Sequence, residues 1–471
     1  MATPRNITRS VLPGVKLRAG RPNLTYHPLL DMIAAATPGT WIKANANLYS
    51  DAWAPAAFRS GWPTVNDSPA SPKTIINAWC SFAWRDGADP GLVLFGGGHA
   101  NSSSSEIYEW RATDRAWRLA YHTTQYEAVG AAGERSIAGS TVAPISAHTY
   151  ANQVWLEKLN RFITFGGAAH SGGANWVVSD QAGTVLRPAG PFTLDLSLAG
   201  LGYVSGPTGS NVKRAGTESA GVSLTGANAW SLRDYWSTEH PVIKSVIGHM
   251  VGHRNGTVVA SVENNHDVVY VLSDNGNAGS QYLYRIELVD TDYRSDLISI
   301  AGAGWNNGMT DQQSALDPKR KLFVVPTDRS LEVWNLNTPG DNNRNIKVAT
   351  AGIGGAGAAE FQATARRCGL IHDERRGYFV GWEFGKTLWR LSPPATNANL
   401  TTGWTLTKLF GEDLPAGPVT AAAATGDVAA SGVHGKWKRS AMLDVYVGLQ
   451  HNTEGQVWMF KPHDWLDPRG I

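Results

Sequence analysis

Short apolar, β-rich segments are separated by polar turns along much of this chain, as expected for buried β-strands. From residue 78 onward one unit recurs: an apolar first strand, a polar turn, a β-rich second strand, a loop, and a third strand with an aromatic residue. The second strands begin near residues 92, 161, 257, 321, 378 and 445. Helical periodicity is weak, with segment 27–36 as the fair candidate. Each unit is therefore predicted to be a four-stranded meander.

Radial packing of such meanders produces a β-propeller, so we expect an all-β propeller with six four-stranded blades, or seven as the alternative. The sixth unit ends at QVWMF (456–460) without a clear fourth strand. The isolated strand TWIKAN (40–45) is expected to supply that strand and to close the ring. Segment 190–247 lacks the repeat, and we interpret it as an insertion or a degenerate extra blade.

Two strand assignments decide where the loops of the repeat open. In the second unit the third strand is placed at NWVVSD (175–180). In the third unit GHMVG (248–252) is taken as the first strand and TVVASV (257–262) as the second. The ENNH segment (263–266) is then predicted to be a loop between second and third strands.

Composition narrows the classes of function. A net charge of +2 provides no general attraction to nucleic acid or to anionic membranes, so neither is expected as a partner. Cys80 and Cys368 are the two cysteines, which excludes a disulfide scaffold, and no apolar run approaches the roughly 18 residues of a membrane span. No secretory signal is predicted, because residues 1–30 lack an apolar core segment.

The chain is expected to divide into a basic, Pro-rich N-terminal arm (residues 1–38) and a propeller domain (residues 39–471). The first 30 residues carry five basic side chains and no acidic one. We expect the arm to dock on a partner protein, and a simply ordered or frayed terminus is the alternative.

Two segments show the repeat clearly: VLFGGGHANSSSSEIYEWRATDRAW (93–117) and FITFGGAAHSGGANWVV (162–178). They resemble blades of Kelch-type and galactose-oxidase-like propellers, and the GGGHAN loop is similar to propellers encoded in tail or appendage genes of tailed bacteriophages and prophages. This resemblance implies a virion protein, with other virion proteins bound through residues 1–38, a homo-oligomeric assembly, and host surface polysaccharide as ligand. No Cys–Tyr pair suggests the oxidase copper site, so no metal and no cofactor are expected.

In a propeller the loops between second and third strands open on one face. Six candidate ligand-binding residues are assigned to these loops: His99, Asn101, His170, His266, Arg329 and His451. Loops between blades open on the same face and add His434. Such side chains suit carbohydrate hydroxyls, which need many donors and acceptors. The alternative is that each histidine merely hydrogen-bonds the backbone of its own loop.

The preferred function is a structural or appendage protein of a tailed-phage virion that contacts host glycan and acts outside the cell after lysis. A polysaccharide lyase is the first alternative, since a His or Tyr base and a cation facing a uronate carboxylate would suffice. Its candidate catalytic residues are His99, His170, Tyr203 and Arg214. A Kelch-like interaction scaffold is the second alternative. The recurrent tryptophans of the third and fourth strands are expected to pack blades rather than bind ligand: Trp110, Trp117, Trp334, Trp389 and Trp458.

Overall fold

The structure is a computed structural model, and it describes a defined part of the chain. The described residues are 28–53, 72–77, 79–87, 89–97, 106–121, 126–128, 134–136, 143–144, 146–169, 177–179, 185–188, 190–198, 203–205, 223–225, 229–233, 257–274, 281–288, 293–300, 313–327, 330–338, 345–364, 368–410, 417–418 and 433–470.

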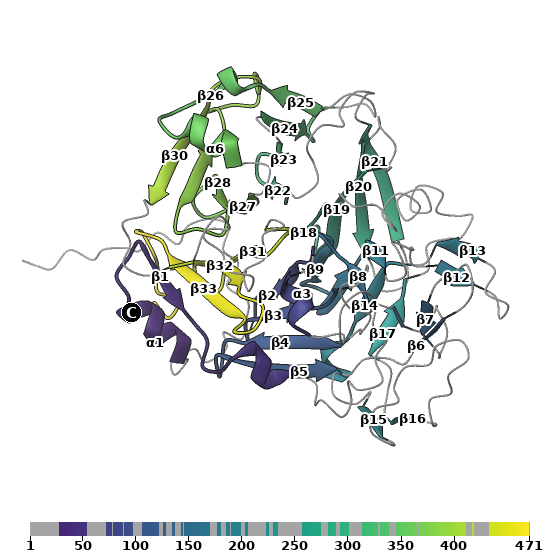
Figure 1. Cartoon of the computed structure of the whole chain (residues 1–471). Coiled ribbons are helices and arrows are strands. Elements are labelled where there is room, and N and C mark those ends of the chain that lie inside the picture. The colour runs from purple at the N-terminus through teal and green to yellow at the C-terminus, as the bar shows by residue number, and fades with distance from the viewer. Residues whose placement is uncertain are drawn as a thin grey trace, which may run out of the picture.

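Six antiparallel sheets stand around a common axis as the blades of a β-propeller (Figure 1). In each blade the strand named first lies nearest the axis and the others follow outward. Blade 1 has β2 (Phe82–Arg85), β3 (Gly91–Leu94), β4 (Ile107–Arg111) and β5 (Ala116–Tyr121). Blade 2 has β9 (Gln153–Leu156), β10 (Arg161–Thr164), β14 (Phe192–Leu194) and β17 (Trp230–Leu232). Blade 3 has β18 (Thr257–Glu263), β19 (His266–Asp274), β20 (Gln281–Leu288) and β21 (Tyr293–Ile300).

The remaining blades follow the same plan. Blade 4 has β22 (Ala315–Asp317), β23 (Leu322–Thr327), β24 (Ser330–Asn335) and β25 (Asn345–Val348). Blade 5 has β27 (Gly369–Asp373), β28 (Tyr378–Trp382), β29 (Leu388–Ser392) and β30 (Trp404–Phe410), with β26 (Ile353–Gly354) added in parallel at its edge. Blade 6 has β31 (Trp437–Ser440), β32 (Val445–Gln450), β33 (Gln456–Lys461) and β1 (Thr40–Lys43). The prediction of six four-stranded blades is confirmed.

Shorter elements decorate this ring. The α-helices are α1 (Pro28–Ala35), α3 (Lys73–Asn77) and α6 (Ala358–Thr364), and 3-10 turns cover Tyr49–Ala52, Leu196–Leu198 and Thr350–Gly352. Four two-stranded sheets lie outside the blades: β6 (Tyr126–Ala128) with β7 (Glu134–Ser136), β8 (Ala147–His148) with β11 (Ala168–Ala169), β12 (Val177–Ser179) with β13 (Val185–Pro188), and β15 (Tyr203–Ser205) with β16 (Ser223–Thr225). None of the helices in the described ranges is long and apolar enough to cross a membrane.

The first strands of neighbouring blades run parallel to one another. Parallel bridges join Ala151 to Thr257 and Gln313 to Gly369 where these strands begin. One face of the ring therefore carries the starts of all first strands and the loops between second and third strands, and we call it the entry face. The opposite face carries the turns between first and second strands.

The predicted closing strand is confirmed. β1 pairs antiparallel with β33, from Thr40 opposite Lys461 to Lys43 opposite Trp458, and the two strands lie side by side in Figure 1. The expected helix is also present as α1, which packs next to this closure. The Lys461 ammonium donates to the carbonyl oxygens of Ala34 (3.0 Å) and Ala36 (2.8 Å), and so caps the C-terminus of α1.

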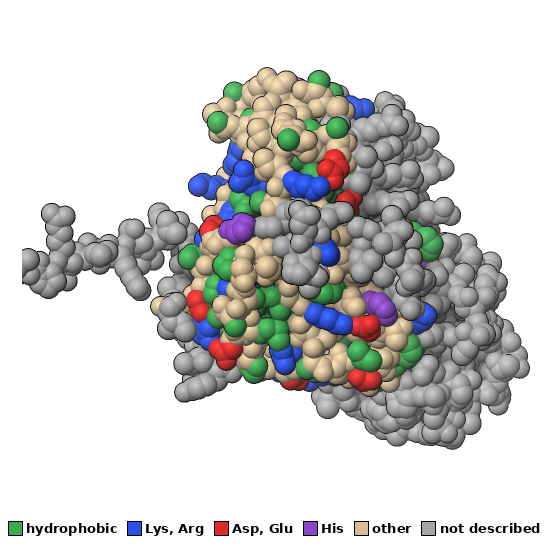
Figure 2. All heavy atoms as spheres, turned by 60° about the vertical axis from the view of Figure 1, so that its left-hand side comes forward, with side chains coloured by type: hydrophobic (Ala, Val, Ile, Leu, Met, Phe, Trp, Pro, Cys, Tyr) green, Lys and Arg blue, Asp and Glu red, His purple; other side chains and the backbone are tan. Residues whose placement is uncertain are grey.

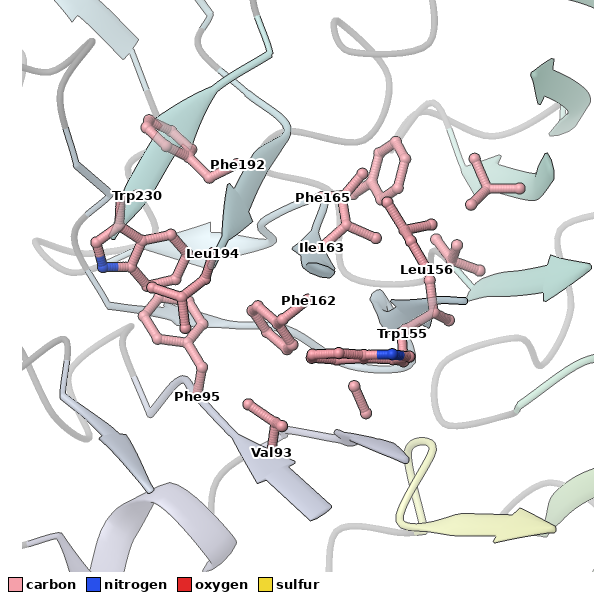
Figure 3. Close-up of a cluster of buried hydrophobic side chains, with 14 of the residues drawn as sticks. Val93, Phe95, Trp155, Leu156, Phe162, Ile163, Phe165, Phe192, Leu194 and Trp230 are labelled. Carbon is pink, nitrogen blue, oxygen red and sulfur yellow. The ribbon is translucent and has the colours of Figure 1, made fainter. Parts of the chain in front are cut away.

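Large apolar side chains fill the space between blades. The ring centroid of Trp230 in blade 2 lies 5.2 Å from that of Phe95 in blade 1 and 6.3 Å from that of Phe192. Figure 3 shows these three side chains in one apolar cluster. The predicted packing role of the recurrent tryptophans is confirmed, because all five of them are buried. Cys80 and Cys368 are free and buried, and burial raises the pKa of each thiol.

The assignment of NWVVSD (175–180) as the third strand of blade 2 is wrong. β12 from that segment pairs with β13 in a separate hairpin, and β14 pairs with β10 instead. Phe192 and Leu194 of β14 supply the buried apolar side chains that the blade interface needs. Segment 190–247, interpreted as an insertion or an extra blade, thus contributes β14 and β17 to blade 2, with β15 and β16 between them.

The strand order predicted for the third unit is also wrong. TVVASV forms β18, the first strand, and residues 248–252 lie outside the described part of the chain. Asn264 and Asn265 both have positive φ, which suits the tight two-residue hairpin from β18 to β19. β21 provides the fourth strand. His266 is therefore on the opposite face, not on the entry face where the sequence interpretation put it.

Polar clasps join successive first strands on the opposite face. His372 Nε2 of blade 5 lies 3.4 Å from Oδ2 of Asp317 in blade 4. One blade further, Arg439 Nε lies 3.0 Å from Oδ1 of Asp373. On the outer surface presented in Figure 2, acidic and basic side chains are interspersed rather than gathered by sign.

Candidate functional site

Three chain segments meet on the entry face just before the first strands of blades 1, 2 and 6. They are residues 79–81, 146–152 and 433–436. The backbone N–H of Tyr150 donates to the carbonyl oxygen of Trp79 at 2.7 Å. Since blades 1, 2 and 6 are neighbours in the closed ring, these segments converge although residues 433–436 are more than 280 residues along the chain from the other two.

The segment before blade 6 makes close contact with both other segments. Lys436 Nζ donates to the Cys80 carbonyl oxygen at 2.8 Å. A Cβ added at Gly435 would lie 2.8 Å from the Cβ of Ser81 and 3.2 Å from the Cα of Ala151. Glycine is needed here because a side chain would push the three segments apart.

Four aromatic side chains from these segments form a continuous row, which we call the mouth cluster: Trp79, His148, Tyr150 and His434. Ring centroids are 4.8 Å apart for Trp79 and His148, 6.0 Å for His148 and Tyr150, and 5.9 Å for Tyr150 and His434. Trp79 is 37% exposed, whereas the other three are buried. The row therefore ends in an accessible indole.

Two members of the mouth cluster have unusual backbone conformations. Tyr150 has φ 44° and His434 has φ 46°, in the left-handed region that bulky residues rarely adopt. Such conformations cost about 1–2 kcal/mol each and are concentrated at functional sites. The fold thus holds these two rings in set positions against a local backbone preference.

Glycine pairs make room for the segment that carries His148. A Cβ at Gly96 would lie 3.0 Å from the Ala147 carbonyl oxygen, and one at Gly167 would lie 1.6 Å from the His148 carbonyl oxygen. Both glycines lie within three residues after the second strand of their blade. The Gly pairs that define the sequence repeat are therefore explained by this close backbone approach.

Buried polar side chains lie next to the mouth cluster at the starts of other first strands. Gln313 Nε2 donates to the Trp437 carbonyl oxygen at 2.8 Å, and the hydroxyls of Thr257 and Ser314 are 2.9 Å apart. These bonds join blades 3, 4 and 6 around the axis. Within the described ranges no group of three His, Cys, Asp or Glu residues could hold a metal ion.

Of the two described residues that the sequence had assigned to loops between second and third strands, His451 lies in such a loop and His266 does not. His451 lies in the turn between β32 and β33, where its Nδ1 accepts a hydrogen bond from the Glu454 backbone N–H at 3.0 Å. This contact of a histidine with its own loop is the alternative raised from the sequence. His266 lies on the opposite face, and Tyr203 begins β15 in the connection between β14 and β17. His99, Asn101, His170, Arg214 and Arg329 lie outside the described residues.

Sequence reasoning named His434 but missed Trp79, His148 and Tyr150. The signal was present in the segments that precede the first strands, AWC before blade 1 and HTY before blade 2. No local spacing links these two segments, so the sequence by itself does not show that they meet.

Comparisons with known proteins add little to this picture. No protein-family model and no curated protein matches the chain. Among solved structures, an α-L-arabinanase of Penicillium chrysogenum complexed with arabinobiose is similar with a TM-score of 0.40 and 8% identity, over 82% of this chain and 94% of that chain. A puromycin-hydrolyzing peptidase of Mycobacterium tuberculosis has a TM-score of 0.31 and 9% identity, over 88% of this chain and 57% of that chain.

These similarities are too distant to carry an argument about activity. The strand pairing by itself defines the class, which is a six-bladed β-propeller closed by an N-terminal strand.

Proposed function

We propose that this protein is a carbohydrate-binding β-propeller whose binding surface is the mouth cluster on the entry face. The observation that carries the proposal is the exposed indole of Trp79, which lies at the convergence of three blades and against His148. An aromatic face accepts the C–H face of a sugar ring, and an indole offers one N–H donor as well.

Two further features support a glycan ligand. His148, Tyr150 and His434 bring polar ring atoms to the same row, and those atoms suit sugar hydroxyls. The strained backbones of Tyr150 and His434 indicate preorganisation, which lowers the entropy cost of binding.

The proposal is tested by measuring binding of the full chain to a panel of bacterial surface polysaccharides by affinity electrophoresis and calorimetry. Trp79→Ala is expected to weaken binding about 30-fold, the effect of losing a central aromatic contact of about 2 kcal/mol. The matched control is Leu466→Ala, because Leu466 is 53% exposed and its backbone contacts Asp444 on the opposite face. Equal loss in both variants, or full binding by Trp79→Ala, would contradict the proposal.

We extend the proposal to a place on the particle of a tailed phage, with residues 1–38 as the docking arm. This extension is motivated by the resemblance of the repeat segments and by the basic arm. Deleting residues 1–27 retains α1 and β1, so the propeller should still fold. The expected result is a folded, glycan-binding chain that no longer enters particles, which immunogold labelling of purified virions would detect.

A polysaccharide lyase activity on the same face is a second candidate, favoured by the position of Tyr150 between two histidine rings. Tyrosine and histidine are residue types that remove a proton α to a uronate carboxylate. Incubation with acidic polysaccharides should then generate unsaturated products with new ultraviolet absorbance, and Tyr150→Phe should abolish it. Binding without any such product would leave the protein a lectin.

A further inference from the structure

Blade 6 carries a lysine at a position that is apolar in comparable blades. Lys438 lies on β31, two residues before the end of the first strand. Blades 2, 4 and 5 have a following turn of the same four-residue length. Their equivalent residues are Val154, Ala315 and Ile371, and all three are buried. The fold therefore does not require a cation here.

The residues beside Lys438 on the neighbouring strands of blade 6 are apolar. Strand pairing puts Lys438 in register with Val447, Met459 and Ile42. These three belong to the same buried cluster as Phe82 of blade 1. Lys438 is thus at the inner end of the interface between blades 6 and 1, on a strand next to the axis (Figure 1).

Lys438 has no partner within the described part of the chain. Its ammonium makes no hydrogen bond or ion pair there. The Asp86 carboxylate, which directly follows β2, already accepts hydrogen bonds from the Ser440 hydroxyl (2.6 Å), the Ala441 N–H (2.8 Å) and the Trp84 indole N–H (2.9 Å). Burial lowers the pKa of Lys438 to about 8, while the side chain keeps partial exposure to solvent.

A desolvated ammonium without a counter-charge is unfavourable. A second lysine, Lys436, lies two residues earlier, just before β31 begins, and its ammonium donates to the Cys80 carbonyl oxygen. A retained positive charge in apolar surroundings, with access to solvent and without a counter-charge in the described part of the chain, is the arrangement that a small anion stabilises.

We propose that Lys438 is an anion-binding site inside the ring, which binds a carboxylate or a small oxyanion. The three N–H donors of the ammonium would bind the anion's oxygen atoms, and the apolar wall of blade 1 would exclude competing water. The anion is either free in solution or the acidic group of a sugar ligand, since both present the same chemistry.

The test compares wild type with Lys438→Met, which keeps the stem of the side chain and removes the charge. Thermal unfolding of both chains is followed in sodium acetate, sodium sulfate, sodium glucuronate, or glucose with sodium chloride, at equal ionic strength. Without the probe anions Lys438→Met is expected to be the more stable chain. Acetate, sulfate or glucuronate should then raise the midpoint of wild type relative to Lys438→Met by about 2 °C.

The pattern among the anions identifies the source. Equal effects of acetate, sulfate and glucuronate would indicate a free anion, whereas an effect confined to glucuronate would indicate an acidic sugar. Equal responses of both chains to every anion would overturn the proposal. An independent readout is the NMR titration of the Lys438 amine in wild type, whose midpoint should move to higher pH when glucuronate or acetate is added, and which stays fixed if no anion binds.

Discussion

The Tyr446 phenol in blade 6 donates a hydrogen bond to Oδ2 of Asp373 in blade 5 at 2.7 Å. Asp373 is fully buried at the end of its first strand. It also pairs with Arg376 Nη1 at 2.6 Å and with Arg439 Nε of blade 6 at 3.0 Å. One carboxylate therefore joins two blades on the face opposite the mouth cluster.

Asp373→Asn is expected to lower the free energy of unfolding by about 3 kcal/mol, because it removes one of the two buried carboxylates that Arg376 and Arg439 share and leaves Asp444 to pair with both. The measurement is urea denaturation followed by tryptophan fluorescence. Glu360→Gln serves as the control, since it breaks an exposed ion pair with Lys408 and should cost at most about 0.5 kcal/mol. Similar losses in both variants would show that the clasp between blades 5 and 6 contributes no more than a surface pair.

The free energy of unfolding should also fall at acid pH, because the carboxylates of Asp373 and Asp317 become protonated. Burial by itself raises the pKa of the Asp373 carboxyl, but the charges of Arg439 and Arg376 and the Tyr446 hydrogen bond hold it below the ordinary value. Burial likewise raises the pKa of Asp317, and the hydrogen bond and charge of His372 lower it overall.

Each of these carboxyls has a lower pKa in the folded chain than in the unfolded chain. Between those two values the unfolded chain binds more protons, so lowering the pH lowers the free energy of unfolding. This stabilisation is present above about pH 4, the ordinary aspartate pKa, and is lost as pH falls through the lower folded value. Thermal unfolding midpoints measured from pH 7 downward should fall below about pH 4, and more gently in Asp373→Asn. A parallel decline in wild type and variant would contradict the assignment.

Ring closure is expected to depend on Trp41 of β1. Its side chain is buried among Trp382, Trp437 and Phe460, and its indole N–H donates to the Lys386 carbonyl oxygen at 2.9 Å. Trp41→Ala should destabilise the protein by about 4 kcal/mol, in the range for large core truncations. Leu48→Ala, at a residue that is 42% exposed, should change stability by about 0.5 kcal/mol or less. Differential scanning calorimetry of both variants checks this.

A side chain at Gly167 would cause both a steric clash and backbone strain, and a matched pair of variants separates these two effects. Gly167 has φ 148° and Gly87 has φ 140°, but no atom lies within 4 Å of a Cβ added at Gly87. Gly87→Ala should cost backbone strain alone, about 1–3 kcal/mol. Gly167→Ala should cost more, because its methyl group meets the His148 carbonyl oxygen, and it should also weaken glycan binding. Calorimetry and affinity electrophoresis test both effects, and equal behaviour of the two variants would refute the explanation.

The sequence by itself favoured six blades over seven, predicted the closing strand and located the glycine pairs. These features follow from local causes: the short apolar runs of strands such as RFITF, the tight turns between them, and the lone strand TWIK that lacked a neighbour. The recurrent tryptophans were predicted correctly as packing residues for the same reason, since their spacing repeats with the blade.

The tertiary structure alone decided which strands complete blade 2 and which residues meet at the mouth. β14 and β17 are separated by 35 residues, so no local pattern shows that Phe192 and Trp230 belong to one sheet. Trp79 and His434 lie in one row because β1 closes the ring and brings blade 6 beside blade 1. Local patterns specify strands and turns, whereas the packing of whole blades around an axis specifies the site.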